Sequence, residues 1–392
     1  MVEIYKYDFE TLVNRRNAGS VKWNQMYKAN PNLSDRIVPL SAADMELKTA
    51  PGIVENLKKY LDDSILGYTS PTDDYYNSVI GWMERRHGFS PRREWFIESP
   101  GVVPAIKHMV EALTEPGDSV LIMTPVYYPF RSVPTSLGRK VVESELIARE
   151  NTYIIDFDDF ESKARMDEVK LFILCSPHNP SGRVWSKQEL EKLCQICYEN
   201  DVFIISDEIH FDLIMPGYNH VSLGTFEDRY LNNCAVCTAP SKTFNLAGLQ
   251  TANIFITNKD VRERVLEVKG HGGVNVLGFK ACEFAYNHCE EWLCQAIQVI
   301  DGNRKYAEDF ISNNIPQVKT FELQATYLLW LDFNVLGMDH NELEMFMQNR
   351  AQLFLNQGYA FGKGGYGFER INIACPRWVI EGAMDRLLRA LS

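Results

Sequence analysis

Short apolar segments alternate with amphipathic helical patterns through the middle of this chain of 392 residues. Each apolar run is only a few residues long and rich in Ile, Val and Leu, which is typical of strands buried on both faces. Because helices such as 187–199 and 259–268 separate the runs, the pattern predicts an α/β fold with a mainly parallel sheet flanked by helices. The predicted strands include Ser119–Met123, Leu171–Cys175, Val202–Ile205, Ala235–Cys237 and Asn253–Thr257.

The pattern changes after Gly278. This second part predicts a smaller α/β domain (286–392) that follows a large domain (49–285). Its expected elements are a long helical stretch from about 279 to 313, a strand-rich patch at 327–333, a helix near 341–356, a Gly-rich loop at 362–367, a run at 370–374 and a last helix near 379–391.

Three polar residues follow the ends of predicted strands: Asn179 in Ser-Pro-His-Asn-Pro-Ser-Gly, Asp207 in Ile-Ile-Ser-Asp, and Lys242 in Ala-Pro-Ser-Lys-Thr-Phe-Asn. Ligands of parallel sheets bind at the carboxyl ends of the strands, so we expect all three residues in one site. Taken singly, each also has a structural interpretation. Asn-Pro-Ser-Gly is a turn sequence, an aspartate after a strand often caps a helix, and an isolated loop lysine usually lies at the surface.

These three motifs, in this order and spacing, resemble the fold-type I enzymes of the aminotransferase superfamily, which depend on pyridoxal 5′-phosphate (PLP). Finer features resemble the MalY/PatB branch and its cystalysin-like C–S β-lyases. The resemblance runs from about residue 8 to the last residue, and it implies that the N-terminal segment (1–48) joins the small domain. The finer features are Asn14-Arg-Arg, Lys22-Trp23, Ala43-Asp44-Met45, Gly101-Val-Val-Pro, Pro125-Val-Tyr-Tyr-Pro-Phe, Asp207-Glu-Ile-His-Phe-Asp-Leu and Arg370-Ile-Asn-Ile-Ala-Cys-Pro.

The resemblance implies PLP as the cofactor and roles for four residues around its ring. Lys242 would form a Schiff base with the cofactor aldehyde and later move the substrate Cα proton, while Asp207 would keep the pyridine nitrogen protonated. Asn179, followed by a cis bond to Pro180, would donate its amide to the phenolic oxygen. His210 stands where many aminotransferases carry a tyrosine. It could bond the same oxygen or be a histidine satisfied within the core.

The cofactor phosphate is expected at a helix N-terminus. Pro104 suits the first helical position, so the N–H groups of Val102 and Val103 would face the phosphate, and Ser241 would add a hydroxyl. Taken alone, this stretch is a turn and a helix start. Tyr68 resembles the tyrosine that reaches the phosphate of the neighbouring subunit, which implies a homodimer.

The resemblance also implies the substrate contacts. Arg370 would bind the α-carboxylate together with the segment at Ala43, since a guanidinium fork suits a carboxylate. Tyr127 would stack on the PLP ring and Tyr128 would point toward the substrate. The alternatives are a surface ion pair for Arg370 and core packing for the two tyrosines.

The sequence departs from the family pattern at three places. Gln250 replaces the usual arginine on the phosphate, and Ala239 replaces a serine for the same group. Ser41-Ala42-Ala43 replaces the Trp-Val-Ala of MalY-like relatives, which puts the identity of the substrate in doubt.

The branch resemblance implies a C–S β-lyase that converts L-cystathionine, L-cysteine or L-cystine to pyruvate, ammonia and a thiol or sulfide. Lys242, Asp207 and Tyr128 would be its catalytic residues. An aminotransferase with the same first half-reaction is the alternative. A regulatory protein that uses this fold to bind a partner is a third hypothesis, although nothing in the sequence marks a partner surface.

The composition of the chain predicts which classes of partner it does not bind and in which cellular compartment it lies. The net charge of −12 argues against binding to nucleic acid or acidic membranes, and no apolar run is long enough to span a membrane. The first residues lack the apolar core of a signal peptide, and the nine cysteines are an odd number, so we expect free thiols and a cytoplasmic protein. The pairs Cys194/Cys197 and Cys234/Cys237 fit core thiols better than a zinc site because their spacing is too long.

Overall fold

The computed structural model describes residues 5–392. Residues 1–4, which belong to the expected N-terminal segment and to the stretch without a signal-peptide core, lie outside the described residues. The strands are β1 (Phe96–Ser99), β2 (Ser119–Thr124), β3 (Lys140–Glu145), β4 (Ile147–Arg149), β5 (Thr152–Ile154), β6 (Val169–Cys175), β7 (Phe203–Asp207), β8 (Cys234–Thr238), β9 (Ala252–Ile256), β10 (Lys319–Thr320), β11 (Leu328–Asp332), β12 (Asn356–Gln357) and β13 (Phe368–Asn372). The α-helices are α1 (Val21–Ala29), α2 (Pro51–Asp62), α3 (Asp73–His87), α4 (Val102–Leu113), α5 (Pro129–Ser136), α6 (Phe157–Ala164), α7 (Lys187–Glu199), α8 (Asp228–Leu231), α9 (Pro240–Thr243), α10 (Lys259–Lys269), α11 (Val276–His288), α12 (Glu290–Asn314), α13 (His340–Met345) and α14 (Arg377–Leu391).

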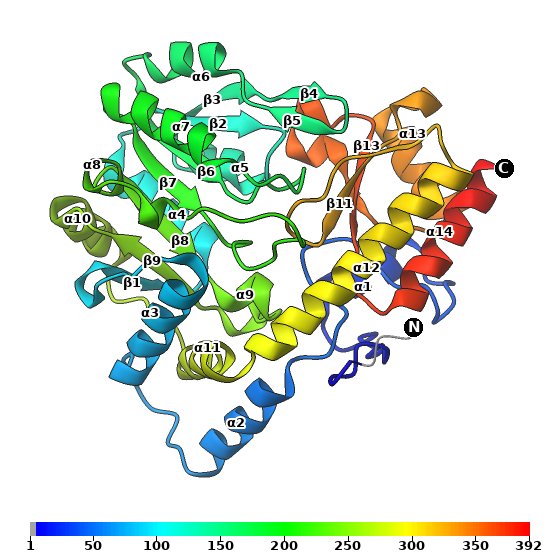
Figure 1. Ribbon diagram of the computed structural model, residues 1–392, viewed down its shortest axis with the longest axis horizontal. Coiled ribbons are helices and arrows are strands. Elements are labelled where there is room, and N and C mark those ends of the chain that lie inside the picture. The colour runs from blue at the N-terminus through cyan, green and yellow to red at the C-terminus, as the bar shows by residue number, and fades with distance from the viewer. Residues whose placement is uncertain (1–4) are drawn as a thin grey trace.

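A seven-stranded sheet, ordered β1-β9-β8-β7-β6-β2-β3, forms the centre of the larger part of the molecule (Figure 1). Both of its faces are buried, because successive side chains of a strand point to opposite sides. On β6, Leu171 and Ile173 pack in one apolar core, which includes Met109 of α4. Phe172 and Leu174 pack in another core, which includes Leu190 of α7. Helices on both faces therefore enclose the sheet, as the sequence predicts.

One strand departs from the parallel pattern. β3, β2, β6, β7 and β8 are parallel neighbours, whereas β9 is antiparallel to both β8 and β1. The chain makes no long crossover helix between β8 and β9; residues 239–251 contain only the short α9 and a 3₁₀ turn. Without a crossover the chain returns beside β8 in the opposite direction. This connection carries Lys242 and keeps it at the carboxyl end of β8.

A four-stranded antiparallel sheet, ordered β10-β11-β13-β12, forms the second centre, with α12 and α14 beside it (Figure 1). The predicted helical stretch at 279–313 is two helices, α11 and α12, separated at Cys289. The helix predicted near 341–356 is too long: α13 continues as a π-helical turn to Arg350 and stops there. Gln352 has a left-handed backbone (φ 50°), and Asn356 already belongs to β12.

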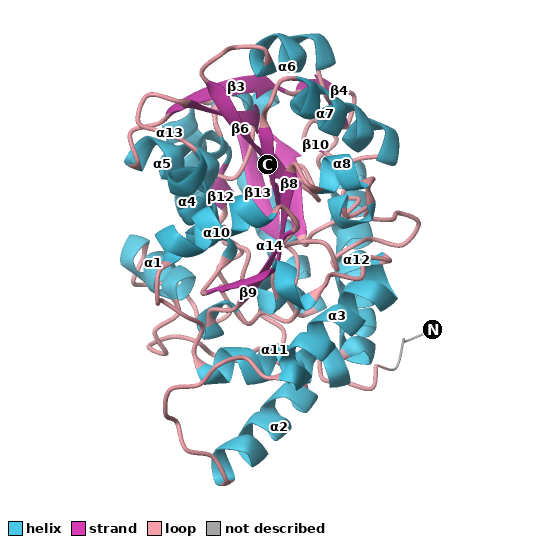
Figure 2. Cartoon of the chain, turned by 90° about the vertical axis from the view of Figure 1, so that its left-hand side faces the viewer, coloured by secondary structure: helices cyan, strands magenta, loops and turns pink. Residues whose placement is uncertain are grey.

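The N-terminal segment runs along this second part of the molecule. The Lys6 amide donates to Gln295 of α12 (2.9 Å), and the Trp378 indole of α14 donates to the Glu10 carbonyl (3.3 Å). By contrast, α2 and the loop after it project away from the body in both views (Figure 2). No helix within residues 5–392 combines the length and apolar character needed to cross a bilayer.

Candidate functional site

The polar groups that the sequence places after strands meet at one edge of the large sheet. Asp207 ends β7 and is the register partner of Cys175, which ends β6, while Asn179 follows β6 and Lys242 follows β8 on α9. Arg370 comes from β13 of the other sheet and reaches Asn179, with 2.6 Å between Nη1 and Oδ1. The site is therefore built where the two sheets face each other.

Asp207 is a buried carboxyl group with little compensation for its charge. Its Oδ1 accepts one hydrogen bond, from the Ile209 amide (3.1 Å). No ion pair to Asp207 occurs among residues 5–392. Burial raises the pKa of this carboxyl to about 7. A cationic ring nitrogen placed beside Asp207 would supply the missing counter-charge.

Lys242 is partly buried, and its Nζ donates to the Ala43 carbonyl at 2.8 Å. Burial, with a further contribution from the nearby Arg370 cation, lowers the pKa of this amine to about 8. A substantial share of the amine is then neutral near physiological pH. A neutral amine can attack an aldehyde or accept a proton from carbon.

Arg370 is a buried cation held by neutral oxygens. Its Nη1 donates to Asn179 Oδ1 and its Nη2 to Asn356 Oδ1, each at 2.6 Å, and the guanidinium lies 4.7 Å from the centre of the Phe361 ring. Its Nε has no hydrogen-bond partner within the described chain, and no described carboxylate forms an ion pair with it. Burial lowers the pKa of Arg370 to about 10. The surface ion pair considered for Arg370 is thus not what the structure shows, and a ligand carboxylate would fit this guanidinium.

His210 is also buried with an unused polar atom. Its Nδ1, like the Tyr327 hydroxyl beside it, lacks a hydrogen-bond partner in the part of the chain that the structure describes. Burial lowers the pKa of His210 well below its ordinary value, so the ring is neutral. Of the two interpretations given above, a histidine satisfied within the core does not match this geometry. The bond to a cofactor oxygen stays a prediction.

The predicted turn at Asn179 and the predicted helix start at Val102 can be compared directly with the structure. The Asn179–Pro180 bond is cis, as predicted. α4 begins at Val102 after Gly101, which provides no side-chain cap, so the first N–H groups of the helix, including that of Val103, stay free for an anion. Pro104 is the third helical residue and not the first as predicted, because the helix already begins at Val102.

The tyrosines and Ser241 differ in exposure. Ser241 is buried, Tyr127 is partly buried with its ring centre 5.1 Å from that of Tyr128, and Tyr128 is 56% exposed. Tyr68 lies in the projecting loop after α2 and is fully exposed. Its predicted contact with a neighbouring subunit stays a prediction.

Comparison with known proteins identifies the family in which this cluster occurs. The cluster consists of the buried Asp207 carboxyl, the Lys242 amine of lowered pKa and the Arg370 guanidinium without an ion-pair partner. Residues 35–387 match the family of class I and II aminotransferases. The chain belongs to this family. The match to the family also accounts for the mainly parallel sheet with a site at its carboxyl edge.

Among its relatives in the aminotransferase family are proteins of the branch that the motifs predict. The chain is 39% identical to cystathionine β-lyase PatB of Bacillus subtilis over 98% of this chain and 100% of that protein. It is 29% identical to protein MalY of Escherichia coli over 98% of this chain and 99% of MalY. A crystal structure of cystalysin from Treponema denticola, which contains PLP, superposes with a TM-score of 0.97 and 46% identity, covering 99% of both chains.

Two residues that contact the predicted site residues were missed by the sequence analysis. Asn356 accepts from Arg370 and also from the Ala42 amide (2.6 Å), and Tyr327 faces His210. The pattern around Asn356 indicated a helix, so nothing in the sequence suggested a strand residue in contact with β13. Tyr327 stood at the start of a predicted strand and gave no signal beyond that.

The cysteines of the two Cys-x-x-Cys motifs are free thiols buried within the large part of the molecule. Burial raises the pKa of Cys194, Cys197, Cys234 and Cys237, so these thiols stay protonated. Within residues 5–392, no group of three or more His, Cys, Asp or Glu side chains could hold a metal ion.

Proposed function

We propose that this protein is a PLP-dependent C–S β-lyase that cleaves L-cystathionine, L-cysteine or L-cystine to pyruvate, ammonia and a thiol or sulfide. The observation that carries the proposal is Arg370, a buried guanidinium with no carboxylate partner among residues 5–392, in one cluster with Lys242 and Asp207. Such a cluster suits an α-amino acid, which brings a carboxylate and a Cα proton. The names of the relatives, cystathionine β-lyase for PatB and cystalysin for the superposed structure, support the branch.

The residues present fit PLP as the cofactor. Lys242 would hold the aldehyde carbon, Asp207 the pyridine nitrogen, and Asn179 and His210 the phenolic oxygen, while Tyr127 would cover the ring. Val102, Val103 and Ser241 would hold the phosphate. Asp207 and His210 both carry unused hydrogen-bonding capacity of the kind that a ring cation and a phenolic oxygen would satisfy. When bound, PLP supplies an electron sink that makes the substrate Cα proton acidic.

The chain's own groups would then divide the work of elimination. Arg370 binds the carboxylate and, with the backbone near Ala43, fixes the direction of the Cα–H bond. Lys242 accepts that proton at Nζ, the electron pair moves toward Cβ, and the Cβ–S bond breaks with its pair left on sulfur. The thiolate takes a proton from Lys242 or from Tyr128. The released aminoacrylate is hydrolysed to pyruvate and ammonia.

The alternative is a PLP-dependent aminotransferase, since the fold and the first proton transfer are the same in both reactions. The difference lies in where Lys242 returns the proton. A transaminase returns it to the cofactor carbon and needs a 2-oxo acid as the second substrate, whereas a lyase regenerates itself without one. A regulatory role in binding a partner protein is the less favoured third possibility.

The deciding experiment measures pyruvate release from L-cystathionine and L-cysteine by the purified, PLP-loaded protein with no 2-oxo acid added. Steady release over many turnovers is expected. Turnover that begins only after a 2-oxo acid is supplied would assign the protein to the aminotransferases instead.

We also propose that the protein acts as a cytoplasmic homodimer and that Tyr68 contacts the phosphate bound by the neighbouring subunit. The support is the exposed loop after α2, where Ile65 is 92% exposed and Leu66 is 59% exposed beside Tyr68. Apolar side chains exposed together are typical of a surface that a partner covers. Sedimentation of the wild type and of a Tyr68→Ala variant would test the assembly, and titration of both apoproteins with PLP would test the cofactor affinity separately.

A further inference from the structure

Residues 42–46, called the strap below, lie between the two halves of the site. The Ala43 carbonyl accepts from Lys242 Nζ at 2.8 Å. On the other side, Asn356 Oδ1 accepts both from the Ala42 amide and from Arg370 Nη2, each at 2.6 Å. The strap thus contacts Lys242, the residue expected to move the proton. Through the Asn356 amide oxygen it is also linked to Arg370, the residue expected to bind the carboxylate.

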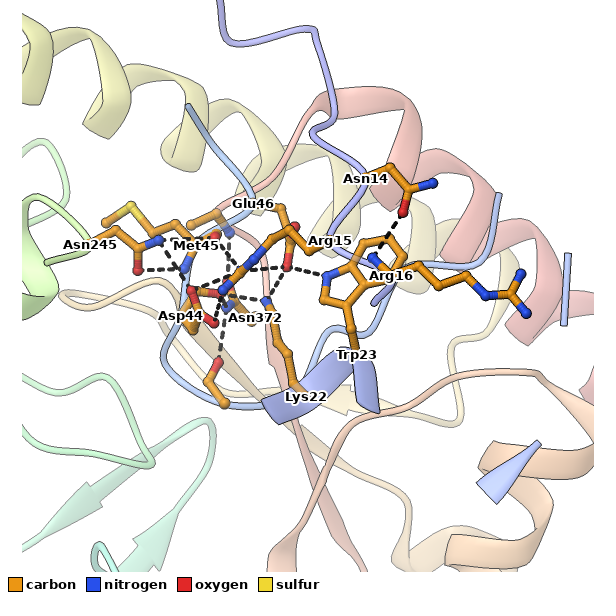
Figure 3. Close-up of polar contacts among 12 residues, drawn as sticks. Asn14, Arg15, Arg16, Lys22, Trp23, Asp44, Met45, Glu46, Asn245 and Asn372 are labelled. Carbon is orange, nitrogen blue, oxygen red and sulfur yellow. Dashed lines mark hydrogen bonds and ion pairs between the residues drawn. The ribbon is translucent and has the colours of Figure 1, made fainter. Parts of the chain in front are cut away.

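A bidentate ion pair between Arg15 and Asp44 connects the strap to the N-terminal segment (Figure 3). Arg15 donates from Nη1 to Asp44 Oδ1 (3.1 Å) and from Nη2 to Asp44 Oδ2 (2.9 Å). Asp44 Oδ1 also accepts from Asn245 Nδ2 (3.1 Å), and Asn245 Oδ1 accepts from the Met45 amide (2.9 Å). Asn245 lies in the loop just after Lys242 and has a left-handed backbone (φ 56°), a conformation that asparagine tolerates better than most residues. Arg15 is therefore linked through Asp44 and Asn245 to the loop that carries Lys242.

Glu46 and Asn372 add further charged and polar contacts to the strap. Glu46 is buried and accepts from Lys22 Nζ (2.8 Å), Trp23 Nε1 (2.9 Å) and Arg15 Nη1 (3.1 Å). Asn372 donates to the carbonyls of Ala42 (2.9 Å) and Asp44 (2.8 Å). Two cations therefore face two carboxylates, and side chains from the N-terminal segment, β13 and the Lys242 loop all bond to the same short strap.

Resting on the proposed function, we propose that Arg15 and Asp44 are positioning residues for Lys242. Their ion pair holds the strap so that the Ala43 carbonyl receives the Lys242 amine whenever that amine is not bonded to the cofactor. The amine then stays aimed at the substrate carbon while Arg370 holds the carboxylate. Arg15 acts at a distance, through the strap, and touches neither substrate nor cofactor.

The test compares Arg15→Met with Arg16→Met. Arg16 is the matched control, because it is the adjacent arginine and its contacts, an ion pair with the exposed Asp35 (3.1 Å) and a guanidinium 4.1 Å from the centre of the Tyr27 ring, do not involve the strap. We expect Arg15→Met to lower kcat about tenfold, with KM changed less than about threefold, because small misplacement of a reacting group costs rate more than binding. Arg16→Met should stay within about twofold of the wild type on both constants, as exposed ion pairs contribute little.

A second readout uses the protein without cofactor and does not depend on the reaction. Hydrogen exchange of the Met45 amide, which is bonded to Asn245, should accelerate about tenfold or more in Arg15→Met, while amides of β8 and β9 stay unchanged. Asn245→Asp, which sets a carboxylate against Asp44, should give the same two changes without altering the N-terminal segment.

The outcomes separate cleanly. Faster exchange throughout β8 and β9 would assign Arg15 to general stability and overturn the proposal, as would a loosened strap with unchanged kcat. If the wild type turns over only with a 2-oxo acid, the lyase assignment fails, yet the same comparison of kcat and exchange still tests the strap in that reaction.

Discussion

Asp207 and Asp212 belong to one segment and are both buried, yet their surroundings are opposite. Asp212 receives hydrogen bonds from Trp82, Arg86 and Thr243, and it contacts His87 at 2.9 Å. Although burial opposes ionisation, these partners hold the pKa of Asp212 below its usual range. Asp207 has one backbone donor, and burial raises its pKa to about 7. Burial alone therefore does not mark a functional carboxylate, and Asp207 differs from Asp212 in lacking charged partners.

The same contrast divides the buried charges more widely. Glu46 and Asp212 are satisfied by side chains and connect segments that are distant in sequence. Asp207, Lys242 and Arg370 converge on one place without forming ion pairs to any described residue. A folded chain that keeps such groups together loses stability, and a ligand that neutralises them recovers it.

The largest effect is expected for Lys242→Ala, which removes the proposed proton carrier from the cluster that it forms with Asp207 and Arg370. Turnover should fall by about 10⁴-fold, the upper range for a positioned acid–base residue. The apoprotein should melt no lower than the wild type, because Lys242 forms no ion pair with any described residue and its removal therefore leaves no carboxylate without a partner. Pyruvate assay and thermal melting check both parts. Substantial remaining pyruvate formation would contradict the assignment of Lys242.

Asp207→Asn should stabilise the apoprotein in a pH-dependent way. The folded pKa of about 7 lies above the unfolded value near 3.9, so the native state holds a proton that the unfolded chain has lost. The wild type therefore loses stability as pH rises from about 4 to 7, by at most about 4 kcal/mol, and the loss is complete above that range. The advantage of the Asn variant should be absent near pH 4 and largest above pH 7. Denaturant unfolding at several pH values measures it, and an advantage that does not change with pH would refute this account.

Asp212→Asn should act in the opposite direction. Removing one member of a buried charged cluster leaves Arg86 facing a neutral amide, which costs about 3 kcal/mol of folding free energy. Thr243 follows Lys242 directly, so a modest loss of activity is expected as well. Unfolding at pH 7 should show Asp212→Asn below the wild type and Asp207→Asn above it. If both variants shifted the same way, the distinction between paired and unpaired carboxylates would fail.

The position of most of the site residues was predictable from the sequence, because one rule places them. Asn179, Asp207 and Lys242 each follow an apolar run, and strand ends of a parallel sheet meet at one edge. Arg370 required its motif, since a strand-interior position has no comparable rule. The domain limits 49–285 and 286–392 stay a prediction.

What could not be predicted depends on pairing between distant segments. Asn356 contacts Arg370 only because β12 pairs with β13, and the local pattern there indicated a helix. The antiparallel direction of β9 follows from a connection without a crossover helix, which the apolar runs alone do not reveal. The contact of Arg15 with Asp44 likewise depends on how the N-terminal segment lies against the site.

The smallest effect is expected for Arg370→Lys, and it tests whether the unpaired guanidinium is a receptor for a carboxylate. Lysine keeps the positive charge but loses the fork that matches two carboxylate oxygens. It would also give up one of the two bonds to Asn179 and Asn356. We expect KM for L-cystathionine to rise and kcat/KM to fall about 100-fold, within the range for losing one partner of a buried charged contact. Arg389→Lys, a change at an exposed arginine of α14, is the control and should alter neither constant more than about twofold. An Arg370→Lys enzyme with unchanged KM would show that the guanidinium is buried for a structural reason, and the contrast with Asp212 would then concern Asp207 and Lys242 alone.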